Sequence, residues 1–256
     1  MNLQRTFGTT VAASTYKLNY ILLLGLPLLL FIVAIAFIEI ADIDRRLASI
    51  IYTLGGNEWT LRHHWVTDQL VHEYGRHLTT MVTFITIGLL VSSWLHSGLR
   101  AGRRVFGYLL LAPVLTTSLI QTLKHKTNMD CPYNVNLFGG ENTYFTLWQS
   151  RPLDNIAHYC FPAGHASAGY CWVALFFVFH YLPESWKPRC TWLKPKYGLA
   201  YGLALGLIFG LSQQLRGAHF ISHDIWTATI CWLCSGLLAY FLLERAQPKF
   251  TDLRHT

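Results

Sequence analysis

The chain has 256 residues, of which 52% are hydrophobic and only 13% are charged. Soluble globular domains usually contain about 25% charged residues, so this composition indicates an integral membrane protein and argues against an ordinary soluble domain. The formal net charge of +7 does not require a nucleic-acid partner, because the basic residues gather where a membrane protein would place them on its cytoplasmic face.

Membrane-spanning helices are expected over six apolar stretches. A bilayer core about 30 Å thick requires roughly 20 apolar residues in a helix. The stretches that approach this length are 19–40, 79–97, 105–123, 166–183, 197–215 and 225–243. The first is expected to be a retained anchor, because it lacks a small-residue cleavage site and is longer than the apolar core of a secretory signal. The sequence therefore predicts one all-α domain over residues 1–256, a six-helix transmembrane bundle with an anchor helix at 19–40, a loop at 41–78 and a core at 79–243.

The distribution of basic residues predicts the orientation of this bundle. In the predicted topology, twelve of the 20 Lys and Arg residues lie on the side of the membrane that holds both termini. The other eight lie on the opposite side, mixed with most of the acidic residues. Because cytoplasmic segments carry an excess of basic residues, both termini are expected in the cytoplasm. The twelve residues are Arg5, Lys17, Arg100, Arg103, Arg104, Lys187, Arg189, Lys194, Lys196, Arg245, Lys249 and Arg254.

The first outward loop, residues 41–78, is expected to contain an amphipathic helix that lies at the membrane interface. Apolar residues recur in it at roughly helical spacing among charged residues. These residues are Trp59, Leu61, Trp65, Leu70 and Val71. The loop also contains several histidines, but His63, His64 and His72 share no firm face with a carboxylate at metal-ligand spacing. No metal site is therefore expected there.

Glycines repeat every four residues in the fifth apolar stretch, at Gly198, Gly202, Gly206 and Gly210. In a helix this spacing puts all of them on one face, where the missing side chains let a neighbouring helix approach closely. We interpret the repeat as architectural.

Three polar clusters lie at the membrane ends that this topology turns outward. They read KHKTNMDCP from Lys124, PAGH ending at His165, and RGAHFISHD from Arg216 to Asp224. Ionisable residues are unfavourable beside a bilayer and by default suggest a functional site. Taken alone, Lys124 could be a boundary lysine and His165 an interfacial histidine. The three clusters together favour one shared site.

Phosphoryl transfer is the chemistry that these side chains suit. Its transition state spreads negative charge over three oxygens, which lysine can meet with a compact charge and arginine with a bidentate fork. One histidine can attack phosphorus while a second protonates the departing oxygen. Gly164 permits close approach of the backbone, and the amides at the start of a helix favour an anion.

The order and spacing of these residues resemble the type 2 phosphatidic acid phosphatase superfamily, integral-membrane lipid phosphatases related in site design to vanadium haloperoxidases. The family pattern reads KxxxxxxRP, then PSGH, then SRxxxxxHxxxD, in six transmembrane helices with the site at the outer face. The likeness covers the chain from about residue 79 onward. Lys124 matches the lysine, Pro162, Gly164 and His165 match the second motif, and His219 matches the last histidine. The resemblance implies that His219 is a nucleophile that forms a phosphohistidine, that His165 protonates the leaving group, and that no metal or other cofactor takes part.

The first two motifs each differ from the family pattern at one position. Cys131 replaces the arginine of the first motif, and Ala163 replaces the serine of the second. The first change removes a phosphate-binding guanidinium and the second removes a hydroxyl.

The third motif is shifted. Its arginine falls on Gln213, and we expect Arg216, about one helical turn further on, to bind the same phosphate instead. Its aspartate falls on His223, which Asp224 follows. A carboxylate is the better partner for an imidazole that becomes cationic, so we expect Asp224 to orient His219 through a local irregularity, with His223 as the alternative.

Cys131 and Cys160 are the only two of the six cysteines on the outward side, and each borders a site motif. An oxidising exterior would allow them to form a disulfide that closes a loop of about 30 residues, worth about 3 kcal/mol in the chain-entropy model. The alternative is a pair of free thiols at the base of the loop.

These features together imply a membrane phosphatase that hydrolyses a lipid phosphate or pyrophosphate at the outer leaflet of the plasma membrane, the inner membrane of a bacterium. Its partners are then a phosphorylated lipid substrate and the surrounding membrane lipids. Candidate substrates are phosphatidic acid, phosphatidylglycerol phosphate, undecaprenyl pyrophosphate and the phosphates of lipid A. Two alternatives stay open: a phosphotransferase that passes the phosphoryl group to another lipid, and a non-catalytic relative that binds phospholipid.

Overall fold

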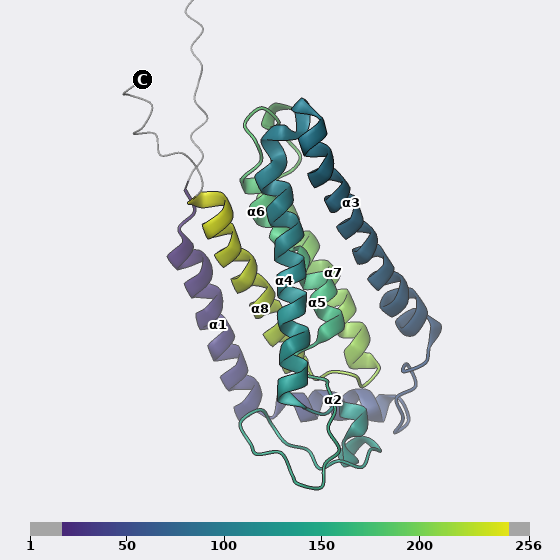
Figure 1. Ribbon diagram of the computed structural model, residues 1–256. Helices are drawn as coiled ribbons and strands as arrows, with labels where there is room; N and C mark the ends of the chain where they lie inside the picture. The colour runs from purple at the N-terminus through teal and green to yellow at the C-terminus, as the bar shows by residue number, and fades with distance from the viewer. Residues whose placement is uncertain (1–16, 246–256) are drawn as a thin grey trace, which may run out of the picture.

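The computed structural model describes residues 17–245, which form an elongated bundle of helices (Figure 1). The described part of the chain contains no β-strand, so the all-α prediction is confirmed. Arg5, Lys249 and Arg254, which belong to the predicted cytoplasmic set, lie outside the described residues.

The α-helices differ widely in length. Five are long: α1 (Tyr20–Ile40), α3 (Gly75–Leu95), α4 (Arg103–Thr127), α7 (Pro195–Leu215) and α8 (Ile221–Ala239). Three are short: α2 (Ile43–Leu54), α5 (Gly164–Tyr170) and α6 (Ala174–His180). The remaining helical segments are the π-helices η1 (Val66–Tyr74) and η7 (Tyr240–Glu244) and the 3₁₀ helices η2 (Ser97–Gly102), η3 (Pro132–Asn134), η4 (Asn136–Phe138), η5 (Cys171–Val173) and η6 (Lys187–Arg189).

Five helical stretches of the described residues are long and apolar enough to cross a membrane: Tyr20–Ile40, Val66–Leu95, Ser97–Asn134, Pro195–Leu215 and Ile221–Glu244. Each overlaps one of the predicted spans. Many of their large apolar side chains are exposed on the surface of the bundle, among them Ile21, Phe84 and Leu207. A surface of this kind suits contact with lipid and marks the chain as a membrane protein.

The fourth predicted span, residues 166–183, is not one long helix. The chain there runs through α5, η5 and α6 in succession, and its side chains are among the most buried in the molecule, including Cys171, Val173 and Phe177. The small residues of α5 explain why this segment is so buried, because they let α7 pack directly against its backbone. A β-carbon on Gly169 would lie only 2.6 Å from the α-carbon of Gly206 in α7. Six continuous spans are therefore not confirmed.

The glycine repeat of α7 makes the close approach that its spacing predicted. A β-carbon on Gly198 would lie 2.5 Å from the backbone of Leu175, and one on Gly202 would lie 2.6 Å from the backbone of Trp172. Gly206 faces the ring of Tyr170 in the same way. The glycine face of α7 thus packs against the interrupted segment formed by α5, η5 and α6.

The first loop folds differently from the expected interfacial helix. Its α-helix is α2, which precedes Trp59 and runs across the lower end of the bundle in Figure 1. The carboxylate of Asp44 on α2 accepts a hydrogen bond of 2.9 Å from the backbone N–H of Ser222, in the first turn of α8. Trp59 packs its ring on Gly217, between α7 and α8. The loop is thus held against the chain segment that carries His219.

One end of the bundle collects the three polar clusters. The last turn of α4, the start of α5, the end of α7 and the start of α8 all lie at the end that α2 and the long segment 128–163 cover (Figure 1). Residues far apart in the sequence can therefore line one site there.

Candidate active site

A cavity of about 330 Å³ lies at this end of the bundle, and Lys124, His165 and His219 all line it. The three side chains come from α4, α5 and the turn before α8, so each of the three polar clusters contributes to the lining of this cavity. The other lining residues are Arg62, His63, Cys131, Tyr133, Tyr159, Cys160, Gln213, Arg216 and Ala218.

Lys124 enters the cavity from the last turn of α4. This helix ends at Asn128, whose backbone adopts the left-handed conformation (φ 50°) and donates its N–H to the carbonyl of Lys124. A β-carbon on Gly164 would lie 3.0 Å from Nζ of Lys124 and 3.2 Å from Nε2 of Gln121. The absence of a side chain at Gly164 therefore leaves room for the ammonium group beside the backbone at the start of α5.

A tight turn at the end of α7 positions His219. Gly217 has a φ of +67°, the N–H of Gly217 bonds to the carbonyl of Gln214, and the N–H of Ala218 bonds to that of Gln213. This pair of bonds is the Schellman pattern that ends many helices and favours glycine in the left-handed conformation. It reverses the chain so that the buried imidazole of His219 faces the cavity.

The surroundings of His219 favour its neutral form. Burial lowers the pKa of His219 well below its ordinary value, because the charged imidazolium loses its hydration. The nearby His223, Lys124 and His165 lower this pKa further, and the backbone carbonyl of Cys160 acts weakly in the opposite direction. A neutral imidazole keeps a lone pair with which it can act as a nucleophile.

His223, and not Asp224, lies against His219. The Nδ1 atoms of the two imidazoles are 3.5 Å apart, and both side chains are buried. Asp224 instead accepts a short hydrogen bond from the side-chain amide of Gln214 and sits against Gly210 of α7. The expected irregularity is absent because α8 is a regular helix from Ile221, which points Asp224 toward α7. A catalytic role for Asp224 stays a prediction.

Arg216 lines the cavity but is engaged mainly in holding the first loop. Its Nη2 pairs with the carboxylate of Asp68 in η1 at 2.6 Å, and its Nε donates to the backbone carbonyl of Arg62 at 3.0 Å. Its buried Nη1 has no hydrogen-bond partner among the described residues. Two of the five N–H donors of this guanidinium are thus used within the described residues, and the others remain for a ligand, so the expected contact of Arg216 with phosphate stays a prediction.

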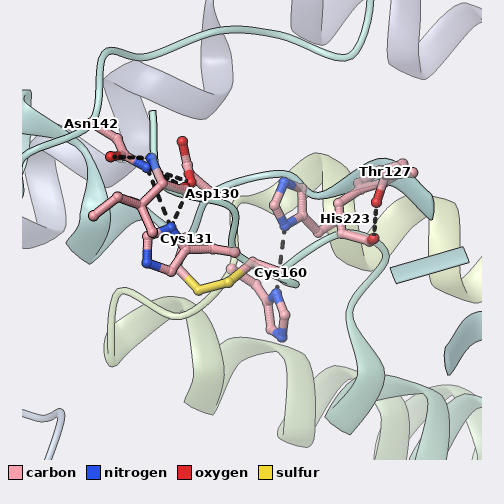
Figure 2. Close-up of a disulfide and its surroundings, with 10 residues drawn as sticks. Thr127, Asp130, Cys131, Asn142, Cys160 and His223 are labelled. Atoms are coloured by element: carbon pink, nitrogen blue, oxygen red, sulfur yellow. Dashed lines mark hydrogen bonds and ion pairs between the residues drawn. A yellow bond between two sulfur atoms is a disulfide. The ribbon is translucent and has the colours of Figure 1, made fainter. Parts of the chain in front are cut away.

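Cys131 and Cys160 form a disulfide beside the two buried imidazoles, with their α-carbons 5.2 Å apart, as the sequence allowed (Figure 2). The buried carboxylate of Asp130 accepts hydrogen bonds of 2.8 Å from the Asn142 amide and 3.2 Å from the Asn155 amide. Its Oδ1 also lies 2.8 Å from Nδ1 of His158. The disulfide and this network therefore join distant parts of the segment 128–163 to one another beside the cavity.

The cavity is also lined by four residues that no sequence motif marks: Arg62, His63, Tyr133 and Tyr159. Arg62 and His63 belong to the first loop, for which the sequence predicted an interfacial helix and no site. Gln213, which stands where the family motif has an arginine, lines the cavity too. Its alignment with a phosphate-binding arginine is the sequence feature that could have predicted this position in the site.

A second cavity, of about 190 Å³, adjoins the first. Lys124, His165 and Gln213 line both. The second cavity is also lined by Val71, Arg76, Thr117, Gln121, Gly164, Ser167, Ala168 and Phe209, which belong to η1 and to helices α3, α4, α5 and α7. It therefore extends from the polar site toward apolar side chains of the membrane-spanning helices.

Metal-binding side chains do not gather into a metal site in the part of the chain that the structure describes. Within residues 17–245, no group of three or more His, Cys, Asp or Glu side chains is placed to hold a metal ion.

Comparison with known proteins gives one match. A family model described as the PAP2 superfamily matches residues 104–247, which is more than half of the chain. No curated protein and no solved structure matches. The matched region includes Lys124, His165 and His219, whereas Arg62 and Asp68 lie before it.

Proposed function

Because the chain belongs to the PAP2 superfamily, whose members are generally phosphatases, we propose that it hydrolyses a phosphate or pyrophosphate group of a membrane lipid through a phosphohistidine. The observation that carries this proposal is the cavity shared by Lys124, His165 and His219. A cation and two imidazoles around one space are the groups that phosphoryl transfer requires.

The proposed reaction has two steps. In the first, the neutral imidazole of His219 attacks phosphorus, a P–N bond forms, the P–O bond to the lipid breaks, and His165 gives a proton to the departing oxygen. In the second, His165 takes a proton from water, whose oxygen attacks phosphorus and breaks the P–N bond, so that inorganic phosphate leaves. Lys124 offsets the negative charge of the phosphoryl oxygens in both steps. We assign the orientation of His219 to His223, which is in contact with it.

The adjoining cavity supports a lipid as the substrate. Its polar wall is shared with the site, while Val71 and Phe209 provide an apolar wall. A phosphate held at Lys124 would therefore have space beside it for the first part of an apolar chain.

We further propose that α5, η5 and α6 together act as a sixth crossing, which places both ends of the chain in the cytoplasm and the cavity at the outer face of the plasma membrane. The disulfide supports this orientation, because such bonds persist in oxidising compartments. The basic residues predicted for the cytoplasmic side support it too.

The test is a panel of phosphorylated and pyrophosphorylated lipids, incubated with the purified protein in detergent with a chelator present. We expect release of inorganic phosphate from at least one lipid and a transient, acid-labile phosphoprotein that the His219→Ala variant does not form. Absence of phosphate release from every lipid would refute the hydrolase assignment. Transfer of the phosphoryl group to a second lipid would identify a phosphotransferase, and binding without turnover a non-catalytic relative.

A further inference from the structure

Arg62 occupies an unexpected place for a residue of the first loop. It lies between α2 and η1, before the region that the family model matches, yet it lines the same cavity as Lys124, His165 and His219. Its side chain is only partly exposed. A guanidinium in this position is close enough to the site to take part in binding.

Two contacts hold Arg62 in the cavity. Its guanidinium lies over the ring of Tyr133, 3.8 Å from the centroid, in a cation–π arrangement. Its backbone carbonyl accepts a hydrogen bond from Nε of Arg216, whose Nη2 is in turn paired with Asp68. Tyr133 thus positions the side chain of Arg62, and Arg216 positions its backbone.

Tyr133 connects Arg62 to the turn that carries His219. The backbone N–H of Tyr133 donates to the carbonyl of Gly217 at 3.0 Å. Tyr133 also follows Cys131 by two residues, so the disulfide fixes the same stretch. The aromatic ring beneath the guanidinium therefore has a defined position relative to the nucleophile.

The cavity has few other cationic groups that could bind an anion, so the guanidinium of Arg62 can serve this role. Lys124 provides one positive charge, and Nη2 of Arg216 is paired with Asp68. Within the described residues, the contact of the Arg62 guanidinium is the cation–π interaction with the ring of Tyr133, and neither a hydrogen bond nor an ion pair is found for it. Its N–H groups lie in the plane of the group, where they can donate to the oxygens of an anion.

We propose that Arg62 binds the phosphoryl oxygens of the substrate, as a second cationic group beside Lys124, and that Tyr133 and Arg216 are positioning residues for it. This inference rests on the proposed phosphatase function and adds a binding residue from outside the matched region. It makes Arg62 a determinant of phosphate affinity in this chain.

Substitution of Arg62 tests the role in turnover. We expect Arg62→Ala to lower kcat/KM for phosphate release by about 100-fold, and Arg62→Lys to retain an intermediate value, because the ammonium restores charge without the bidentate geometry. The matched control is Arg46→Ala, which removes an exposed arginine of the same loop. Thermal unfolding of each variant shows whether the fold is retained.

Binding of inorganic phosphate separates this inference from the proposed function. Calorimetric titration of phosphate into the purified protein should give a Kd at least about tenfold weaker for Arg62→Ala than for the unaltered chain. Tyr133→Leu should also weaken binding, since it removes the ring and keeps the charge, while Tyr133→Phe should not. If Arg62→Ala equals the unaltered chain in phosphate binding, the inference is wrong even where phosphate release proceeds normally. If the unaltered chain releases phosphate from no lipid, the function is wrong, and the titration still decides the role of Arg62.

Discussion

The Nδ1 atoms of His219 and His223 lie 3.5 Å apart, with both imidazoles buried beside the Cys131–Cys160 disulfide (Figure 2). At this separation one ring nitrogen must donate and the other accept, so the contact selects a tautomer for each ring. If Nδ1 of His219 carries the proton, Nε2 keeps the lone pair that attacks phosphorus. The following predictions examine this pair and the groups around it.

The first prediction concerns the nucleophile. His219→Ala should lower kcat for phosphate release by at least about a thousandfold, because no P–N bond can form. Released phosphate is measured for each lipid that the unaltered chain hydrolyses. His64→Ala is the control, since His64 is an exposed histidine of the first loop. Normal turnover by His219→Ala would show that His219 is not the nucleophile.

The second prediction compares the two candidates for orienting His219, which are His223 and Asp224. His223→Phe should lower kcat by about 100-fold with little change in KM, because the imidazole of His219 loses the group that orients it. Asp224→Asn should lower kcat less and mainly reduce the melting temperature, because its contact is with Gln214. Steady-state kinetics and thermal unfolding of both variants decide between them. A larger loss of kcat in Asp224→Asn would restore Asp224 as the orienting residue.

The third prediction concerns pH. The pKa of His219 in the folded chain is lowered, chiefly by burial and further by His223, Lys124 and His165. Below about pH 6.5 the unfolded chain therefore binds a proton at this position that the folded chain does not, so acid favours unfolding. The contribution of His219 to the free energy of unfolding should be constant above about pH 7 and fall by up to about 1.4 kcal/mol per pH unit below pH 6.5.

Melting temperatures in detergent between pH 5 and pH 8 measure this dependence. The His219→Gln variant should lose less stability on acidification than the unaltered chain, because glutamine does not titrate. Equal slopes for the two proteins would show that His219 does not contribute.

The fourth prediction concerns the disulfide. Replacing both Cys131 and Cys160 by serine should lower the free energy of unfolding by about 3 kcal/mol, because the unfolded chain regains the freedom of the loop between them. Phosphate release should fall as well, since Tyr133 and the Cys160 carbonyl lose their anchor. Mass spectrometry of alkylated, unreduced protein checks the bond directly. Modification of both thiols in that experiment would show that they are not paired.

The fifth prediction concerns the glycine face of α7. Gly202→Ala should destabilise the protein by about 1–3 kcal/mol, because the new β-carbon would lie 2.6 Å from the backbone of Trp172, which cannot move aside alone. Gly107→Ala is the matched control, since no atom lies within 4 Å of a β-carbon there. Melting temperatures of both variants measure the difference. Equal values would mean that the contact between α7 and η5 is not tightly packed.

Hydropathy predicted the five candidate membrane-spanning helices, because a helix that crosses a bilayer needs an apolar stretch of about 20 residues, which is visible in the sequence. It did not predict the interruption at η5. The small residues before Tyr170 indicate close packing, but where the helix breaks depends on the backbone of α7 against which it lies. The π-helix η1, which lengthens the second span toward Val66, has no sequence pattern of its own.

The site was predictable to the extent that its residues lie in ordered motifs. Lys124, His165 and His219 could be grouped because each stands at an end of a predicted span, and the predicted topology puts all three ends on the same side of the membrane. The sequence favoured Asp224 over His223 as the partner of His219, whereas the structure places His223 there, because the directions of the two side chains depend on the residue at which α8 begins. Arg62 could not be found at all, since its place in the cavity depends on Tyr133, which lies on a distant part of the chain.

The disulfide also has a consequence for biogenesis. Because Cys131 and Cys160 both line the cavity, its wall is completed by a covalent step that follows insertion of the helices and depends on the redox environment of the compartment where these residues emerge. A host deficient in thiol oxidation should therefore yield chains that are inserted in the membrane but lack the Cys131–Cys160 bond in the cavity wall. Later treatment with an oxidant should convert them to the mature form.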